Sequence, residues 1–372
     1  MDMHTPFEIF LTAPPGLETE LWTETREAGF PDPRKVPGGV TFEGTWPDVW
    51  RANLVLRGAT RVLARIGAFR AFHLAQLDKR ARKFDWGAVL PKGVPLRVEV
   101  STSKRNKIYH AGAAKQRVET ALLEEFGAPI AADAPIQIKL RIEDNNCLFS
   151  VDTSGESLHK RGHKEAVAKA PMRETLASLF LRQAGFDGTQ PVLDPMCGSG
   201  TFVIEAAETA MGLFPGRSRS FAFELLPTFN DDHWQEMRNT PPAAKSQTQY
   251  FGSDRNDGAI AASLANAKRA GVDACTTFER KPVSELTRPE GPVGIVIVNP
   301  PYGTRIGNKK LLYALHATLG DRLKEAFSGW SVGIVTTEAS LARATGLPFL
   351  PPGPPVPHGG LKVKLYRTAP LP

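Results

Sequence analysis

The chain has 372 residues, enough for two or three domains, and its 41% hydrophobic and 23% charged residues exclude wholesale disorder. Three widely spaced cysteines argue against a disulfide scaffold or a structural zinc site, and neither a membrane-spanning run nor a signal-peptide pattern is present, so we expect a cytoplasmic enzyme. The net charge is +7, but residues 61–117 alone hold 14 Lys and Arg against three Asp and Glu, which favours a module that binds a polyanion over a merely solvated surface.

The first part of the chain alternates short strands with helices. Apolar periodicity predicts, in chain order, a strand at 7–11, a helix at 17–28, a strand at 39–43, a helix at 46–57 and a strand at 61–66. This order is typical of a small ferredoxin-like α+β unit, to which we assign residues 1–66. A second unit over residues 67–157 is predicted to contain a strand at 96–101, a helix at 113–126 and strands at 136–142 and 146–152.

The pattern changes near residue 175, where apolar strands begin to alternate with helices. Strands are predicted at 192–193, 250–253, 294–298, 331–336 and 361–367, and helices at 202–211, 260–270 and 311–327. Repeated βα units predict a doubly wound, mostly parallel sheet over residues 158–372. Residues 212–248 interrupt it as a long insertion without an assigned role, whose Phe221–Glu224 and Trp234 could cover a ligand or simply pack.

A glycine-rich loop joins the first of these strands to its helix. Asp194 precedes the loop, and Gly198 and Gly200 would let the backbone approach a ligand closely. The segment is neither a dinucleotide fingerprint, because Val203 stands where a third glycine belongs, nor a phosphate-binding loop, because it lacks the lysine. The carboxylate of Asp194 suits a cationic group on the ligand, although a tight strand-to-helix turn is the alternative interpretation.

A second carboxylate lies at the end of the next predicted strand. Asp254 follows Tyr250–Ser253 and is placed to accept hydrogen bonds from two ribose hydroxyls. The alternative is a helix N-cap role for this side chain. Together, the loop and the acidic strand end favour an adenosine-containing ligand.

The segment after the predicted strand at 294–298 carries the strongest single signal. Asn299 is followed by Pro300, Pro301 and Tyr302, and the two prolines fix the backbone and remove amide donors. The side-chain oxygen of Asn299 and the carbonyl of Pro300 can accept two N–H bonds from a flat base with an exocyclic amine, and Tyr302 can stack on its ring. A simple proline-rich turn would need neither the asparagine nor the tyrosine.

These residues resemble the motifs of a known family. Asp194–Gly200, Asp254 and Asn299–Tyr302 look like those of class I S-adenosylmethionine-dependent methyltransferases, in the branch that methylates exocyclic nitrogens. Further segments resemble THUMP-domain RNA methyltransferases, namely Leu158–His163 with Ala170–Ala177, Asn299–Arg305 and Ser103–His110. The resemblance covers nearly the whole chain and is greatest to the bacterial 23S rRNA guanine-N2 methyltransferases.

The resemblance implies a fold, a reaction and partners. It implies a Rossmann-like class I methyltransferase domain preceded by a ferredoxin-like and THUMP RNA-binding module. The reaction would transfer a methyl group from S-adenosylmethionine to N2 of a guanine in 23S rRNA. We expect a monomer that binds RNA and needs neither a metal nor a membrane.

The resemblance also implies three sets of site residues. The cofactor would be held by Asp194, Met196, Cys197, Gly198, Ser199, Gly200, Thr201, Ser253, Asp254, Pro171 and Glu174. The base would be held at the catalytic Asn299, Pro300, Pro301 and Tyr302. RNA would be contacted by Lys104, Arg105, Lys107, His110, Lys115, Arg117, Lys160, Arg161 and His163.

The sequence departs from the family pattern in places. Phe278–Val283 lacks the aspartate that often contacts the adenine amine, so a backbone group is the alternative, and His163 stands where an aromatic residue is usual. Arg161 and His163 have packing as their alternative role. Because the chain ends at Pro372, shortly after its last predicted strand, we expect a single activity.

Other chemistries are weighed against this interpretation. Cys197 as a nucleophile is disfavoured relative to packing inside the cofactor loop, and His159 with His163 lacks the further ligands of a metal site. Three rival functions remain. They are a tRNA guanine-N2 methyltransferase of the same architecture, an adenine-N6 DNA methyltransferase, and a non-catalytic RNA-binding assembly factor.

Overall fold

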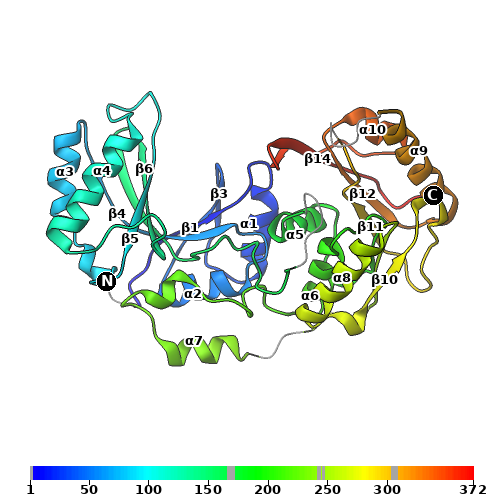
Figure 1. The fold of residues 1–372 in the computed structure, drawn as a ribbon, viewed down its shortest axis with the longest axis horizontal. Helices are drawn as coiled ribbons and strands as arrows, with labels where there is room; N and C mark the ends of the chain where they lie inside the picture. Colours follow the sequence, from blue (N-terminus) through cyan, green and yellow to red (C-terminus); the bar gives the residue numbers. More distant parts are fainter. Residues whose placement is uncertain (1–2, 166–171, 241–243, 245–247, 303–308) are drawn as a thin grey trace. The chain divides into compact units, whose positions relative to one another are not determined.

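The chain folds into two compact units (Figure 1). The structure is a computed structural model that describes residues 3–165, 172–240, 244, 248–302 and 309–372. Unit 1 comprises Met1–Thr12, Glu24–Leu158 and Arg219–Thr240, and unit 2 comprises Ala13–Thr23, His159–Ser218 and Pro241–Pro372. In the described ranges, no helix is both long enough and apolar enough to cross a membrane.

Unit 1 is built on one seven-stranded sheet with the order β2-β3-β1-β4-β7-β6-β5. Its strands are β1 (Phe7–Thr12), β2 (Arg34–Val36), β3 (Gly39–Gly44), β4 (Arg61–Arg70), β5 (Leu96–Ser101), β6 (Ile136–Glu143) and β7 (Asn146–Asp152). Its helices are α2 (Trp46–Val55), α3 (Leu74–Arg82), α4 (Ala111–Ala121) and α7 (Asp231–Arg238), while the residues of α1 (Glu18–Glu27) are divided between the two units. Only β5 and β6 pair in parallel. The ferredoxin-like strand and helix order predicted for the first residues is confirmed.

Strand β4 joins the two predicted N-terminal subdomains, because it pairs with β1 on one side and with β7 on the other. The boundary predicted between residues 66 and 67 falls inside this strand, where the register shifts between Arg65 and Gly67. Gly67 has φ +152°, and a Cβ there would lie 2.9 Å from the ring of Phe84. The glycine therefore marks a β-bulge in a continuous strand and not its end.

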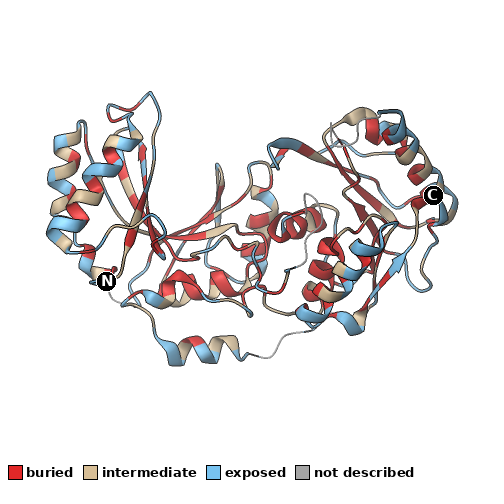
Figure 2. Cartoon of the chain, in the orientation of Figure 1, coloured by how far each residue is buried: buried red, intermediate tan, exposed pale blue. Residues whose placement is uncertain are grey.

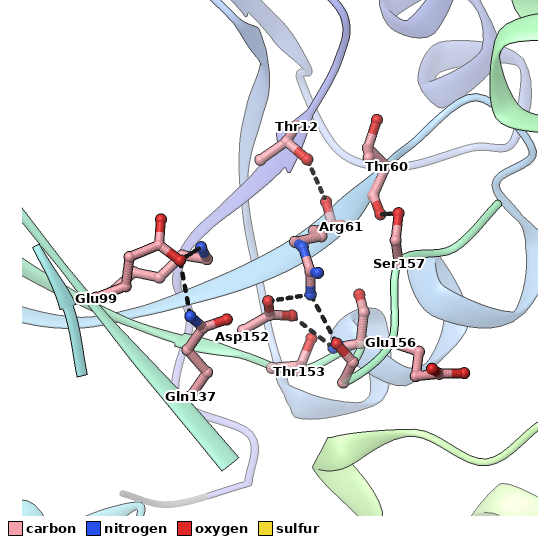
Figure 3. Close-up of polar contacts among 12 residues, drawn as sticks. Thr12, Thr60, Arg61, Glu99, Gln137, Asp152, Thr153, Glu156 and Ser157 are labelled. Atoms are coloured by element: carbon pink, nitrogen blue, oxygen red, sulfur yellow. Dashed lines mark hydrogen bonds and ion pairs between the residues drawn. The ribbon is translucent and has the colours of Figure 1, made fainter. Parts of the chain in front are cut away.

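A buried polar cluster holds the end of β7 against the start of β4 (Figure 3). Asp152 is fully buried, and burial raises the pKa of its carboxyl. Arg61 offsets that cost with one guanidinium nitrogen 2.5 Å from the Asp152 carboxylate and 2.7 Å from the carbonyl of Gly155. The contact holds the last strand of unit 1 and the segment that leaves it in a defined path.

The sequence insertion returns to unit 1. Phe221 and Phe223 stack with ring centroids 5.2 Å apart, and Trp234 meets Phe223 edge-on at 5.0 Å. Phe223 also lies 6.2 Å from Trp50 of α2, and its amide donates to the carbonyl of Thr153 at 3.0 Å. The structure therefore agrees with the packing alternative for these aromatic residues. They belong to unit 1, although the predicted domain 158–372 had included them.

Phe223→Ala should lower the free energy of unfolding by about 3–5 kcal/mol, because it removes a fully buried ring. Chemical denaturation measures this change, with Leu225→Ala as the control because Leu225 is 44% exposed. Calorimetry on the folded variant should show unchanged affinity for S-adenosylmethionine. A specific loss of that affinity would mean that the insertion covers the ligand after all.

Unit 2 is a seven-stranded sheet with the order β10-β9-β8-β11-β12-β14-β13. Its strands are β8 (Val192–Asp194), β9 (Tyr250–Asp254), β10 (Thr276–Arg280), β11 (Ile295–Val298), β12 (Ser331–Thr336), β13 (Val356–His358) and β14 (Leu361–Arg367). Its helices are α5 (Glu174–Gln183), α6 (Thr201–Ala210), α8 (Asp257–Ala270), α9 (Lys309–Ala326) and α10 (Ala339–Ala344). Strands β8 to β12 pair in parallel. Strand β14 pairs antiparallel with β12, and β13 pairs antiparallel with β14. This confirms the predicted doubly wound, mostly parallel sheet.

The strand order of unit 2 reverses at β8, which pairs with β9 on one side and with β11 on the other. In open α/β sheets, the crevice at such a reversal lies outside the carboxyl ends of the strands and binds ligands. Here it receives the residues that end or follow these three strands: Asp194, Asp254 and Asn299. Figure 2 shows α5 and α6 buried along most of their length, so both helices are packed into the interior of unit 2.

Candidate active site

A cavity of about 960 Å3 in unit 2 opens at these strand ends. Most of the predicted cofactor and base residues line it, namely Asp194, Met196, Cys197, Gly198, Ser199, Thr201, Asp254, Asn299, Pro300, Pro301 and Tyr302. Three others, Gly200, Ser253 and Glu174, are not among its lining residues, and Pro171 lies outside the described residues. The cavity therefore unites two motifs that are about 100 residues apart in sequence.

Hydrogen bonds from neighbouring strands and helices hold the glycine loop in place. The amide of Gly198 donates to an Asp254 carboxylate oxygen at 3.1 Å, and the amide of Cys197 donates to the Ser253 carbonyl at 2.9 Å. Helix α8 adds Ser263, whose hydroxyl donates to the Gly198 carbonyl at 2.9 Å. Gly200 has φ +82°, and a Cβ there would lie 3.1 Å from the Ser263 hydroxyl. The loop therefore needs glycine both for its conformation and for the space.

Two carboxylates face this cavity. Asp194 is buried, and burial, with a smaller contribution from nearby Asp254, raises the pKa of its carboxyl to about 8. Its Oδ1 accepts a hydrogen bond from the Met196 amide at 3.0 Å. A cation in the cavity would favour the ionised carboxylates, so this pair suits a positively charged ligand.

Asp254 is not the N-cap of the helix that follows it. Asn256 caps α8, and its side-chain oxygen accepts from the amides of Gly258 at 2.8 Å and Ala259 at 3.3 Å. Asp254 instead accepts from the amides of Gly198 and Asn256 and remains half-buried at the cavity wall. Its carboxylate therefore lies where it can also accept from ligand hydroxyls.

Asn299 brings a buried acceptor into the cavity. Its Oδ1 is inaccessible to solvent and has no hydrogen-bond partner among the residues that the structure describes. Leaving such a group unpaired costs about 1–3 kcal/mol, which a bound donor would recover. Tyr302 is also buried, at 4% exposure, and it lines the same cavity beside Pro300 and Pro301.

The Cys197 thiol has the properties of a packed side chain. Burial, reinforced by Asp194, raises the pKa of this thiol, so the nucleophilic thiolate is disfavoured. Its sulfur lies 3.8 Å from the Ser263 hydroxyl, beneath the loop. These contacts support the packing role over the nucleophilic one.

The segment after strand β10 forms part of the cavity wall, although the sequence analysis did not predict the strand itself. Its Phe278 ring packs so closely over Gly252 that a Cβ on that glycine would lie 2.6 Å from the ring. The residues after the strand, Lys281–Ser284, line the cavity, and the amide of Lys281 donates to the Asp254 carbonyl at 3.0 Å. This stretch holds no aspartate, and Ser284 contributes a hydroxyl to the lining.

The structure does not support RNA contacts by Arg161 and His163. The Arg161 side chain is 1% exposed and pairs with Glu205 of α6 through two bonds of 3.0 and 3.3 Å. His163 is buried with Nε2 3.4 Å from Glu208, and burial lowers the pKa of its imidazole. Arg161 cannot reach a phosphate without breaking its pair with the buried Glu205, and His163 is itself buried against Glu208, so both pack against α6, as the packing alternative proposed.

Lys164, which the sequence analysis did not single out, connects two of the predicted cofactor residues. Its ammonium lies 2.9 Å from the Glu174 carboxylate and donates to the Thr201 hydroxyl at 2.9 Å. Glu174 therefore orients a lysine at the start of α6, and its own carboxylate is already engaged. Nothing in the basic, histidine-containing segment around Lys164 predicts this role from the sequence.

The predicted RNA-contact residues of unit 1 lie at its surface. The exposed side chains are Lys104, Arg105, Lys107, His110, Lys115 and Arg117, and Lys160, just beyond unit 1 in sequence, is also exposed. His110 also has a structural role, because its Nδ1 accepts the Ala113 amide at 3.1 Å as the N-cap of α4. Lys115 lies 3.6 Å from Glu119 in the next helical turn.

Residues 161–348 match the model of a protein family described as the RMKL-like methyltransferase domain. The chain belongs to this family. Residues 8–63 match a second model, the RlmL ferredoxin-like domain.

Several known proteins align with the chain over almost its full length. A Synechocystis sp. protein named "Putative RNA methyltransferase slr0064" is 31% identical over 369 residues, which is 96% of this chain and 95% of that protein. A solved structure described as "SMU.472, a putative methyltransferase complexed with SAH" is 26% identical, has a TM-score of 0.88 and covers 100% of both chains. A Listeria monocytogenes structure described as a "predicted N6-adenine-specific DNA methylase" is 27% identical, has a TM-score of 0.86 and covers 98% of this chain and 97% of that one.

The cofactor of this RMKL-like methyltransferase is S-adenosylmethionine. The residues present fit it, because the cavity combines two carboxylates, a glycine loop that permits close approach, and an acceptor, Asn299 Oδ1, that no described residue pairs. Asp194 suits its positive charge and Asp254 its ribose hydroxyls. Residues Lys281–Ser284, which line the same cavity, would contact its adenine. In the described part of the chain, no group of three His, Cys, Asp or Glu residues is arranged to hold a metal ion.

Binding of S-adenosylmethionine should depend on pH through Asp194. Below pH 8 the carboxyl is protonated, and a cation must displace that proton, so the dissociation constant should fall up to about tenfold per pH unit as pH rises toward 8. Calorimetry in buffers of different ionisation enthalpy would detect proton release at pH 7. Asp194→Asn should abolish this release, and an unchanged profile in that variant would exclude Asp194 as its source.

Arg161→Ala should lower the free energy of unfolding by about 3–5 kcal/mol, because it removes the arginine that pairs with the buried Glu205. Lys160→Ala, at the exposed neighbouring position, should leave stability unchanged. Denaturant titration of both variants makes the comparison. An Arg161→Ala protein of normal stability that binds RNA less tightly would restore the RNA-contact role.

Proposed function

We propose that the protein transfers a methyl group from S-adenosylmethionine to the exocyclic N2 of a guanine in 23S rRNA. The observation that carries the proposal is the buried Oδ1 of Asn299, which has no partner among the described residues and lies in the same cavity as Asp194 and Asp254. It gives an acceptor for an amine beside the site of a methyl donor. The name of the Synechocystis relative supports RNA as the substrate.

The base site would work by localising the lone pair of the amine. An exocyclic amine is a poor nucleophile because its lone pair is delocalised into the ring. Asn299 Oδ1 and the Pro300 carbonyl would accept its two N–H bonds and turn the lone pair toward the methyl group, while Tyr302 would stack on the ring. A paired base cannot enter such a pocket, so the guanine must be unpaired or flipped out.

The chemistry would be a direct displacement: bound S-adenosylmethionine would supply an electrophilic methyl, and S-adenosylhomocysteine would be the leaving group as the nitrogen–methyl bond forms. Asn299 and Pro300 orient the amine, and the rigid glycine loop and Asp254 fix the opposite side of the cavity. Catalysis would rest on positioning and on acceptor electrostatics. The proton leaves the amine after transfer, so no strong general base is required.

The exposed cations of unit 1 would hold structured RNA mainly at its phosphates. Lys104, Arg105 and Lys107 lie on one loop, and Arg117 is on the helix that follows. Such contacts release counterions, so binding should weaken steeply with salt. This support does not separate 23S rRNA from tRNA, which is therefore the second candidate substrate.

The deciding experiment is methyl transfer from labelled S-adenosylmethionine to RNA from cells that lack the gene. The 23S, 16S and tRNA fractions are digested to nucleosides, and genomic DNA serves as a parallel substrate. Label in N2-methylguanosine from 23S rRNA alone is expected. Label in tRNA would identify tRNA as the substrate. N6-methyladenine in DNA would overturn the proposal in favour of the adenine-N6 DNA methylation that is named for the Listeria protein.

Asn299→Ala should abolish detectable turnover and leave the affinity for S-adenosylmethionine nearly intact, because it removes only an acceptor for the base. Asn299→Asp, which keeps an oxygen at that place, should retain part of the activity. Single-turnover kinetics and calorimetry measure the two properties. Loss of both in Asn299→Ala would show that Asn299 shapes the cavity as a whole.

A further inference from the structure

Two exposed aromatic rings in unit 1 occupy matching positions. Phe72 is 48% exposed in the segment Ala71–His73, and Tyr109 is 64% exposed in the segment Ile108–His110. In each segment, the residue before the ring is buried and the histidine after it is the N-cap of a helix, α3 in one case and α4 in the other. Each ring is thus exposed on a backbone that is anchored on both sides.

Both segments lie at one edge of the sheet. Strand β4 is antiparallel to β7, β7 is antiparallel to β6, and β6 is parallel to β5, so β4 and β5 run in the same direction. The helices that follow them, α3 and α4, therefore start at the same edge, and they pack together on one face of the sheet (Figure 1). The turn between β6 and β7, with Asp144 and Asn145, is at this edge too.

Asn145 ties the two aromatic segments to this turn. Its backbone carbonyl accepts the Ala71 amide at 2.9 Å, and its side-chain oxygen accepts the Lys107 amide at 2.9 Å. Its own amide donates to the Asn106 side chain at 3.4 Å. Phe72 therefore directly follows a residue that is bonded to Asn145, and Tyr109 comes two residues after another residue that is bonded to Asn145.

The backbone around each ring is further restrained. The Thr102 hydroxyl donates to the Ile108 carbonyl at 2.7 Å, and the Phe72 amide donates to the Gln76 side chain at 2.8 Å. Ring exposure here does not reflect a loose loop. Pre-organised rings lose little conformational entropy when a ligand covers them.

The charges at this edge are mostly positive. Exposed cations are contributed by the end of β4 and by the loop after β5, namely Arg70, Lys104, Arg105 and Lys107. Asp144 is the exposed carboxylate in the turn itself, and Glu143 beside it pairs with Arg141. The combination of exposed rings with surrounding cations matches surfaces that stack unpaired bases and neutralise their phosphates.

We infer that Phe72 and Tyr109 form a stacking platform for unpaired nucleotides of the RNA substrate. The cations named above bind the phosphates of the same stretch of RNA. This inference rests on the proposed function, since it assumes that RNA is the partner. It adds that the RNA is held in unit 1 by an unpaired stretch and not only by the phosphates of a duplex.

The test compares the binding of two RNAs by the full-length protein. Fluorescence anisotropy uses labelled oligouridylate and an RNA duplex with the same number of phosphates. Tyr109→Ala should weaken oligouridylate binding about tenfold, Phe72→Ala should do the same, and duplex binding should stay unchanged. Tyr109→Phe and Phe72→Tyr, which keep a ring, should bind like the parent protein.

Controls separate stacking from altered folding. Leu123→Ala removes another exposed apolar side chain of unit 1, 54% exposed and beyond the far end of α4, and should have no effect. Photocrosslinking of the unsubstituted protein with a 4-thiouridine oligonucleotide should label the peptides that contain Phe72 or Tyr109. Parent-like oligouridylate binding by both alanine variants would overturn the platform, as would an equal loss for the duplex or crosslinks confined to other peptides.

Failure of the platform is distinguishable from failure of the proposed function. If the parent protein methylates RNA and the ring variants bind oligouridylate normally, the platform is wrong and the function stands. If the parent protein binds neither RNA and methylates no RNA fraction, the proposed function and the platform fail together.

Discussion

The hydrogen bond from the Gly198 amide to the Asp254 carboxylate is the contact on which the site depends. It joins the loop after β8 to the end of β9, and the Cys197 amide reinforces it through the Ser253 carbonyl. Because the loop is held by backbone groups, its glycines are required, and the carboxylate that holds it also faces the cavity. The loop structure and the proposed contact to the cofactor ribose therefore depend on the same carboxylate.

Beneath that loop, α6 depends on charges that are hidden from solvent. Glu205 and Glu208 face inward and are paired with Arg161 and with Arg217 and His163. A buried ion pair contributes little net stability, but removing one partner is costly. The arrangement therefore adds little to stability. Its main effect is to fix the position of α6, whose first turn forms part of the cavity wall.

Much of the site could be predicted from sequence because its signals are local. Asp194, Asp254 and Asn299 each end or follow an apolar strand, and glycines or prolines beside them mark the turns. Strand β10 was missed because it alternates one buried ring, Phe278, with polar residues. Helix α3 was missed for a similar reason, since only Leu77 and Ala81 are buried in a helix rich in charge.

Other features depend on partners that are distant in sequence, and no local pattern could predict them. Arg161 reads as one cation in a basic run, and only the position of Glu205, 44 residues later, turns it into a buried pair. The return of Arg219–Thr240 to unit 1 depends on Trp50, more than 150 residues earlier. Local signals thus predict which residues face the cavity, whereas long-range packing decides which charges remain available.

Both units place their exposed chemistry by the same rule. In unit 2, parallel strands β8, β9 and β11 end at one edge, and the side chains that follow them form the cavity. In unit 1, the parallel strands β4 and β5 end at one edge, where two histidine caps start the helices and two rings are left exposed. Strand direction brings distant segments together in each case, and a short cap or turn fixes what they present. The proposed surface for RNA therefore requires no dedicated scaffold in unit 1, because the sheet that builds its core also aligns the residues at its edge.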